Sequence, residues 1–139
     1  MKIGIRIPCY RKWCRGPEVR RIAECVENLG FDSLWVQDHL VAPLGPPEEI
    51  AVGGTSSRVT LASDIITLPY RNPIVQAKMI GTIDQLSNGR LMIGTGTGHV
   101  EAESKALGID FSKRGRMHDE YLRVIRTILS SEEAAFEGE

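Results

Sequence analysis

The stretch that decides the fold of this chain is residues 29–39, which read LGFDSLWVQDH. Within it, Ser33–Val36 is a short apolar run of the kind that forms a buried strand. Residues 3–8 alternate apolar and polar side chains and stop at a proline, so we predict a first strand there. A helix is predicted between the two. Strand, helix and strand with short joints form a βαβ unit, and the sequence therefore predicts a parallel sheet.

The helix between these strands has clear ends and one apolar face. Pro17 suits the first helical position, and Glu18 suits the positive end of the helix dipole. Gly30 is expected to end the helix in a left-handed conformation. Apolar residues at helical spacing predict the buried face, which is Val19, Ile22, Ala23, Val26 and Leu29.

Residues 41–58 interrupt this rhythm with three prolines and three glycines. They show no helical apolar face beyond one turn at residues 48–52, yet Val59–Ser63 again has the pattern of a strand. Parallel strands are usually joined through a covering helix. The sequence therefore predicts that the helix after the second strand is missing and that part of one sheet face is uncovered.

The second half of the chain returns to alternating strands and helices. Asn72 and Pro73 suit the cap and first residue of a helix that ends near residues 87–89. Arg90–Gly94 is the fourth predicted strand, and helices are predicted over residues 100–107 and 116–129. The helix from Pro73 has a predicted buried face of Ile74, Ala77, Ile80, Ile83 and Leu86. We expect an α/β protein with about four parallel strands.

Composition and charge exclude several classes of protein. Hydrophobic residues make up 42% of the 139 residues and charged residues 25%, as in ordinary globular proteins, so one domain over residues 1–139 is expected. A net charge of -1 gives no bulk attraction to nucleic acid or membranes, and no apolar run is long enough for a membrane span. The N-terminus lacks a signal-peptide core, which predicts a cytoplasmic location. Three cysteines without CxxC spacing argue against disulfides and a zinc site.

Several stretches together resemble signatures of the luciferase-like monooxygenase superfamily, which includes bacterial luciferase-like enzymes and oxidoreductases that use the deazaflavin coenzyme F420. They are residues 29–39, residues 68–73 (LPYRNP), residues 84–98 (DQLSNGRLMIGTGTG), and RGR with DEYL at residues 114–122. Members of this family are (β/α)₈ barrels, which typically need about 250 residues. The resemblance therefore implies a partial TIM barrel, the N-terminal half. From the residue patterns alone, the alternative is an open parallel sheet that is complete in itself.

The resemblance implies a flavin- or deazaflavin-dependent oxidoreductase that performs hydride transfer or monooxygenation at the C-terminal face of the barrel. The implied cofactor is coenzyme F420 or FMN, which carries the chemistry while the protein orients and polarises it. The substrate is a small molecule that the sequence does not identify. The alternative is a non-catalytic half-barrel, whose open first and fourth strands would pair with a second copy to form a homodimer.

The predicted catalytic pair follows the second strand, at the face where barrel active sites gather. An imidazole titrates near neutral pH, so we expect His39 to move a proton as hydride is transferred, while Asp38 orients it or bonds to the ring system. In deazaflavin-dependent members of the family, the pair after this strand contacts cofactor and substrate. The alternative for His39 is a hydrogen-bonded histidine that closes the mouth of the barrel.

The segment Ser63, Asp64 and Ile65 is also implied to bind the cofactor. It matches a position where the family often has a bulge with a cis non-proline peptide bond behind the flavin ring. The alternative is an ordinary strand end in which Asp64 makes a local turn.

The turn Thr97, Gly98 and His99 matches a cofactor-contacting turn of the family, where glycine lets the backbone approach a ring or phosphate closely. Its GxGxG spacing differs from the GxGxxG fingerprint of dinucleotide-binding folds. His99 stands where some deazaflavin-dependent sugar-phosphate dehydrogenases have an acidic residue, which counts against their substrate. The alternative is a tight joint between strand and helix. Arg114 and Arg116 are expected to tie a helix start to neighbouring loops.

Overall fold

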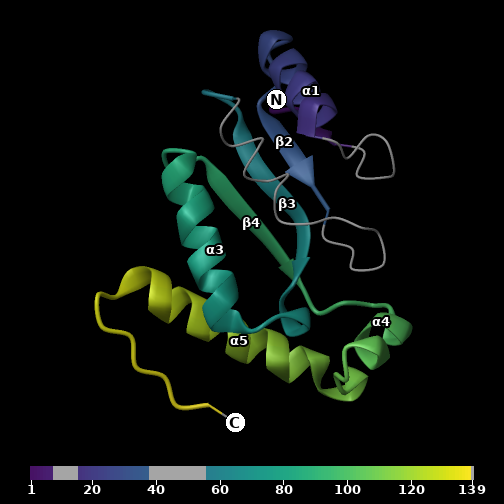
Figure 1. Cartoon of the computed structure of the whole chain (residues 1–139), viewed down its shortest axis with the longest axis vertical. Helices are drawn as coiled ribbons and strands as arrows, with labels where there is room; N and C mark the ends of the chain where they lie inside the picture. Colours follow the sequence, from purple (N-terminus) through teal and green to yellow (C-terminus); the bar gives the residue numbers. More distant parts are fainter. Residues whose placement is uncertain (8–15, 38–55, 139) are drawn as a thin grey trace. The chain divides into compact units, whose positions relative to one another are not determined.

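The computed structural model describes residues 1–7, 16–37 and 56–138 (Figure 1). Strands and helices alternate in the predicted order, and none of the described helices is both long and apolar enough to cross a membrane. The elements are β1 (Gly4–Arg6), α1 (Gly16–Asn28), β2 (Ser33–Val36), β3 (Thr60–Thr67), the 3-10 helix η2 (Leu68–Tyr70), α3 (Pro73–Leu86), β4 (Leu91–Gly96), α4 (Glu101–Ala106), the 3-10 helix η3 (Phe111–Lys113) and α5 (Arg114–Ser130).

The four described strands form one parallel sheet in the order β1-β2-β3-β4. In this sheet Ile5 lies beside Leu34, and Leu34 lies beside Leu61. Each strand therefore neighbours the next one in the chain, as it does in a (β/α)₈ barrel. This arrangement confirms the predicted α/β class and is that of a partial barrel. The prediction of a missing helix after the second strand concerns residues that lie outside the described ones.

Two strands extend further than their sequence patterns predict. β3 runs on to Thr67, past the predicted end at Ser63, and β4 runs on to Gly96, past the predicted end at Gly94. The added residues are Asp64, Ile65, Ile66 and Thr67 in β3, and Thr95 and Gly96 in β4. Polar and small residues can continue a strand because pairing with the neighbouring strand satisfies their backbone groups. The second strand has the predicted bounds.

The predicted helix ends are confirmed by their caps. After α1, Gly30 has a φ of 83° and the Phe31 N–H donates to the Val26 carbonyl at 3.2 Å, which satisfies a carbonyl of the last turn. Before α3, the Asn72 side-chain oxygen accepts a hydrogen bond from the Ile74 N–H at 2.9 Å. Short polar residues and glycine thus set the helix boundaries locally.

The described residues separate into two compact units, each with its own buried residues. The first contains residues 1–66 and 83–94. Its core joins one face of the sheet to α1 and consists of Ile7, Val19, Ala23, Val26, Leu34, Val59 and Leu61. The predicted stripe of α1 is therefore largely confirmed. The assignment of Leu29 to it is wrong, because this residue follows the last helical turn and is 70% exposed.

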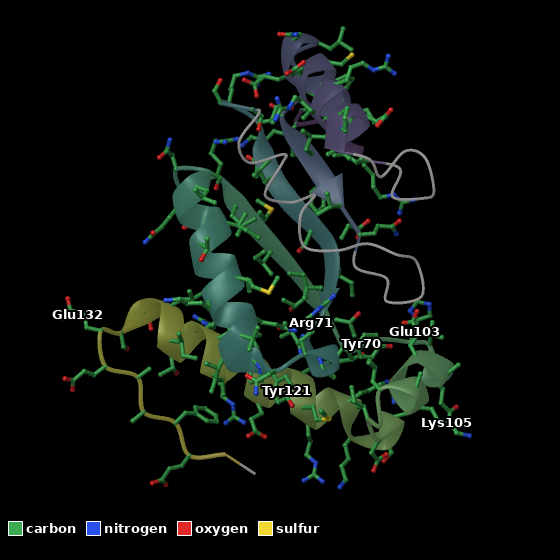
Figure 2. The ribbon with its side chains drawn as sticks, in the orientation of Figure 1. Tyr70, Arg71, Glu103, Lys105, Tyr121 and Glu132 are labelled. Carbon is green, nitrogen blue, oxygen red and sulfur yellow. The ribbon has the colours of Figure 1, made fainter. Side chains whose placement is uncertain are left out.

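The second unit contains residues 67–82 and 95–139. In it α5 packs against η2, whose three residues are all buried, and Figure 2 shows Tyr70 of η2 near Tyr121 of α5. The prediction that Ile74 of α3 is buried is wrong, since it is 61% exposed. The amide of Gln76 faces inward instead and donates to the Leu68 carbonyl at 3.3 Å. Leu86, the last residue of α3, was also wrongly assigned to the buried face and is 57% exposed.

Within the first unit, Glu27 ties the end of α1 to the residues that precede β3. Its carboxylate accepts hydrogen bonds from the Ser57 hydroxyl at 2.6 Å, the Ser57 N–H at 2.9 Å and the Arg58 N–H at 3.3 Å. Partial burial raises the pKa of this carboxyl. Hydrogen bonds from Ser57, Arg58 and Val59 outweigh that effect and lower the pKa from 4.5 to about 2.

We expect Glu27→Gln to lower the free energy of unfolding by about 1–2 kcal/mol at pH 7, after discounting for solvent around these bonds. A carboxyl whose folded pKa is lowered stabilises the fold above its unfolded pKa of 4.5, and this contribution is lost as the pH falls toward 2. Urea unfolding followed by circular dichroism from pH 7 to pH 2 should show the two proteins converging. Glu24→Gln, an exposed position on α1, is the control and should change little.

Candidate functional site

The predicted catalytic pair, Asp38 and His39, lies outside the described residues, which stop at Gln37 before the gap. β2 ends at Val36. The two residues therefore follow the carboxyl end of a parallel strand within three positions along the chain. The catalytic role of Asp38 and His39 stays a prediction that rests on this position in the sequence.

Ser63 is buried, and its hydroxyl joins β3 to β4. Its Oγ donates to the Gly94 carbonyl at 3.0 Å and accepts from the Gly94 N–H at 3.0 Å. A Cβ added at Gly94 would lie 2.6 Å from the Ser63 carbonyl oxygen, so only glycine fits there without a backbone shift. The single O–H of Ser63 is thus used in a hydrogen bond between β3 and β4. Ser63 therefore supports Asp64 and Ile65, which follow it in the strand.

Asp64 and Ile65 continue β3 beyond Ser63, and the peptide bond between them is cis. Of the two alternatives for this segment, the strand end is wrong, because β3 runs on to Thr67. Both side chains remain accessible, since Ile65 is 38% exposed and the Asp64 side chain is 49% exposed. An accessible apolar side chain therefore directly follows an accessible carboxylate in the sequence of β3.

A charged partner of Asp64, which the sequence patterns did not single out, is Arg6 of β1. Its Nη1 lies 3.7 Å from the Asp64 carboxylate. Arg6 is the charged residue in the alternating stretch of residues 3–8, and that charge was the available signal. What the sequence lacked was the register, which places β1 and β3 on either side of β2 and brings the two side chains onto one face.

The glycine-rich turn belongs to the second unit only in part. Gly94 lies inside β4, and Gly98 is the residue with a left-handed backbone, at a φ of 79°. A Cβ at Gly98 would lie 2.8 Å from both the Thr67 methyl group and the Tyr70 hydroxyl. Close packing of the chain against itself therefore accounts for this glycine, as the tight-joint alternative requires.

Thr97 and His99, the neighbours of Gly98, are more accessible than the glycine's surroundings. The Thr97 hydroxyl makes a long hydrogen bond of 3.5 Å to the Gly98 carbonyl within the same turn. His99 is exposed and directly precedes the residue that caps α4. Tyr70 supports this region, because its hydroxyl donates to the Val100 carbonyl at 3.4 Å. The turn thus has a buried support and two accessible polar side chains.

A histidine that sequence reasoning passed over, His118, lies in the same unit on α5. Its Nε2 is 3.1 Å from the Thr95 hydroxyl of β4, and its Nδ1 is 3.2 Å from the Asp119 carboxylate. The side chain is 16% exposed. His118 therefore fastens α5 to the strand end that leads into the Thr97 turn.

The expected structural role of Arg114 is confirmed at the start of α5. Its Nη1 donates to the Phe111 carbonyl at 2.7 Å, and its guanidinium lies 3.8 Å from the centre of the Phe111 ring. Arg116 lines a surface cavity of about 410 Å³ that α5 and residues 136–138 form. The expected structural role of Arg116 stays a prediction. Among the described residues, none of the predicted site residues lines this cavity.

A family model described as luciferase-like monooxygenase matches residues 14–139. The chain belongs to the luciferase-like monooxygenase family. This match covers the four stretches that carry the resemblance, at residues 29–39, 68–73, 84–98 and 114–122, and confirms it.

Curated relatives of this luciferase-like chain use different chemistries. It is 32% identical over 117 residues to 4-hydroxyprotoasukamycin monooxygenase of Streptomyces nodosus subsp. asukaensis, covering 81% of this chain and 32% of the relative. It is 33% identical over 127 residues to F420-dependent glucose-6-phosphate dehydrogenase of Intrasporangium calvum, covering 81% and 38%. The chain thus spans about a third of the length of these relatives, which are monooxygenases and dehydrogenases.

Solved structures share the fold of this luciferase-like chain. Monooxygenase RslO1 from Streptomyces bottropensis superposes with a TM-score of 0.90 at 24% identity, over 100% of this chain and 46% of that one. The oxygenating constituent of 3,6-diketocamphane monooxygenase from Pseudomonas putida, solved in complex with FMN, gives 0.87 at 23% identity, over 100% and 42%. Both matches indicate a chain with the fold of somewhat less than half of a larger protein.

Proposed function

We propose that this luciferase-like chain forms the N-terminal half of an oxidoreductase that uses coenzyme F420 or FMN for hydride transfer or monooxygenation of a small molecule. The family match over residues 14–139 carries the proposal. Relatives named for each cofactor support it, namely the F420-dependent glucose-6-phosphate dehydrogenase of Intrasporangium calvum and an FMNH2-dependent dimethylsulfone monooxygenase of Pseudomonas fluorescens. When bound, such a cofactor supplies the redox chemistry.

The accessible side chains of the described residues suit a planar cofactor with hydrogen-bonding edges. In the first unit, Ile65 offers an apolar surface next to the Asp64 acceptor and the Arg6 donors. In the second unit, Thr97 and the exposed His99 offer hydrogen-bonding groups. In the first unit, we propose that Asp64 and Ile65 contact the cofactor, with Ser63 supporting them through the backbone. Separately, in the second unit, we propose a cofactor-contacting role for Thr97 and His99, with Gly98 as their backbone support.

Asp38 and His39 complete the proposed site as its proton-transfer pair. An imidazole changes charge near neutral pH, so His39 can hold or release a proton beside the reacting atoms. A neighbouring carboxylate favours one tautomer of the ring and fixes its orientation. We propose this role for Asp38, since it precedes His39 at the end of β2.

A fluorescence titration of the purified chain with oxidised F420 and, separately, FMN tests the proposal. We expect saturable micromolar binding of one cofactor, and an increase in its Kd of about tenfold for His39→Ala or Thr97→Ala, because each removes about one hydrogen bond to the ligand. Thr82→Ala is the matched control, since that hydroxyl donates only within α3, to the Lys78 carbonyl. No binding of either cofactor well above micromolar concentrations would contradict the proposal.

A second candidate function is a non-catalytic half-barrel that pairs with another copy of itself. The observation that favours it is the position of β1 and β4 as the outer strands of the described sheet. Unpaired strand edges favour pairing with another chain, and two four-stranded sheets can close into eight strands. Sedimentation equilibrium, which measures the oligomeric state, and the cofactor titration together distinguish the two candidate functions. A dimer that binds neither cofactor would favour this second function.

A further inference from the structure

The two faces of the sheet in the first unit differ in chemistry. Ile5 of β1 and Ile7, which directly follows β1, pack into the core with α1, and Ile7 is only 2% exposed. Successive side chains of a strand point to opposite faces. Arg6, between them, therefore projects from the face opposite α1, and its side chain is 52% exposed.

On this face Arg6 meets Asp64, and the pair does little for stability. The Nη1 to carboxylate distance is 3.7 Å and both side chains are about half exposed. Ion pairs of this kind typically contribute about 0–1 kcal/mol. A guanidinium has five N–H donors in a planar fork, and among the described residues the long contact with Asp64 uses one Nη of this fork.

An aromatic ring lies next to this pair. Trp35 is in register with Arg6 in the sheet, and its indole N–H donates to the Ser33 hydroxyl at 2.9 Å. Gly4 leaves room for the indole, because a Cβ at that position would collide with the Trp35 ring and the Ser33 hydroxyl. The face therefore combines a fixed aromatic ring, a cation and a carboxylate, all in the first unit.

We propose that Arg6, steadied by Asp64, binds the negatively charged pyrimidine edge of the reduced cofactor, and so favours the reduced over the oxidised form. The inference rests on the proposed function. Reduced FMN and reduced F420 share this chemistry, because each can carry a negative charge over the N1 and C2 oxygen positions of the ring system. A guanidinium matches such an edge with two parallel donors, and a hydrogen bond to a charged group is stronger than one to a neutral group.

The test measures the Kd of oxidised and of chemically reduced cofactor under anaerobic conditions, in separate arms for FMN and F420. We expect Arg6→Gln to weaken binding of the reduced form about tenfold or more and of the oxidised form by less than about threefold, since a charge-assisted bond contributes more. A tenfold difference lowers the two-electron midpoint potential of the bound cofactor by about 30 mV. Arg6→Lys, which keeps the charge, should restore part of the preference.

Arg20→Gln, on the exposed face of α1, is the matched control and should leave both Kd values unchanged. Equal weakening of both redox forms by Arg6→Gln would assign Arg6 a structural role and overturn the inference, as would no weakening of either. Absence of binding by the unsubstituted chain would instead overturn the proposed function and the inference with it. The arm that shows the redox-dependent loss identifies the cofactor.

Discussion

Replacing Arg90 with alanine is expected to lower the free energy of unfolding by about 3 kcal/mol. Its guanidinium donates hydrogen bonds to Ser56, Val59 and Ser87 within the first unit, and a hydrogen bond from a charged donor is stronger than one from a neutral donor. Nε donates to the Ser87 carbonyl at 2.7 Å, and Nη2 donates to the Ser56 carbonyl at 2.8 Å. Nη1 donates to the Val59 carbonyl at 2.7 Å and to the Ser56 hydroxyl at 3.1 Å. Removal of the guanidinium leaves these acceptors without their donor.

Urea unfolding at pH 7, followed by circular dichroism, measures this loss. Arg90→Lys should recover only a small part of it, because one ammonium group cannot reproduce a planar fork that reaches three residues. Arg20→Ala, at an exposed position on α1, should change stability by less than about 0.5 kcal/mol. If Arg90→Ala were as stable as the Arg20→Ala control, the four bonds would contribute nothing net, and Arg90 would need another explanation.

Gly94→Ala is expected to destabilise the chain by about 3 kcal/mol and to weaken cofactor binding as well. The new methyl group would lie 2.6 Å from the Ser63 carbonyl oxygen, a backbone atom that cannot rotate away. Separating the strands would also lengthen both hydrogen bonds between the Ser63 hydroxyl and the Gly94 backbone. Overpacking of this kind typically costs about 1–3 kcal/mol, and the strained hydrogen bonds add to it.

Thermal unfolding and the cofactor titration together check this expectation. Gly115→Ala is the control, because a Cβ there meets no atom within 4 Å and alanine is a better helix former than glycine. It should be neutral or slightly stabilising. If the Gly94→Ala protein had the same midpoint of thermal unfolding as the unsubstituted chain, β3 and β4 would be able to separate at no cost in stability. That result would contradict the expectation from the close contact at this position.

Much of the element order was predictable from short-range patterns. The apolar run Ser33–Val36 has the predicted bounds, and Asn72 caps α3 as its side chain suggested. The positive φ of Gly30 was likewise expected from its place after an apolar helical stripe. Each of these features depends on a residue and its neighbours within about one helical turn, so the sequence contains the whole of the relevant interaction.

The candidate site was predictable to a smaller extent. The segment at Asp64 and the turn at Thr97 were located by family resemblance, whereas the partner Arg6 and the second histidine, His118, were not. Gly98 shows that the reason for a residue's identity can lie in residues far away in the sequence. Glycine was expected there for close approach to a ligand, but the atoms that a Cβ would meet belong to Thr67 and Tyr70, some thirty residues earlier.

The sequence by itself determined the alternation of strands and helices, the positions of most helix ends and the family to which the chain belongs. Only the tertiary structure decided which distant residues meet: Glu27 with Ser57, Ser63 with Gly94, Arg90 with Ser56, and Arg6 with Asp64. The physical reason is strand register. A shift of one residue would turn the strand side chains of Ser63, Arg6 and Asp64 to the opposite face of the sheet and would move the residues that flank the strands as well. Register is set by the packing of the whole core rather than by any local pattern.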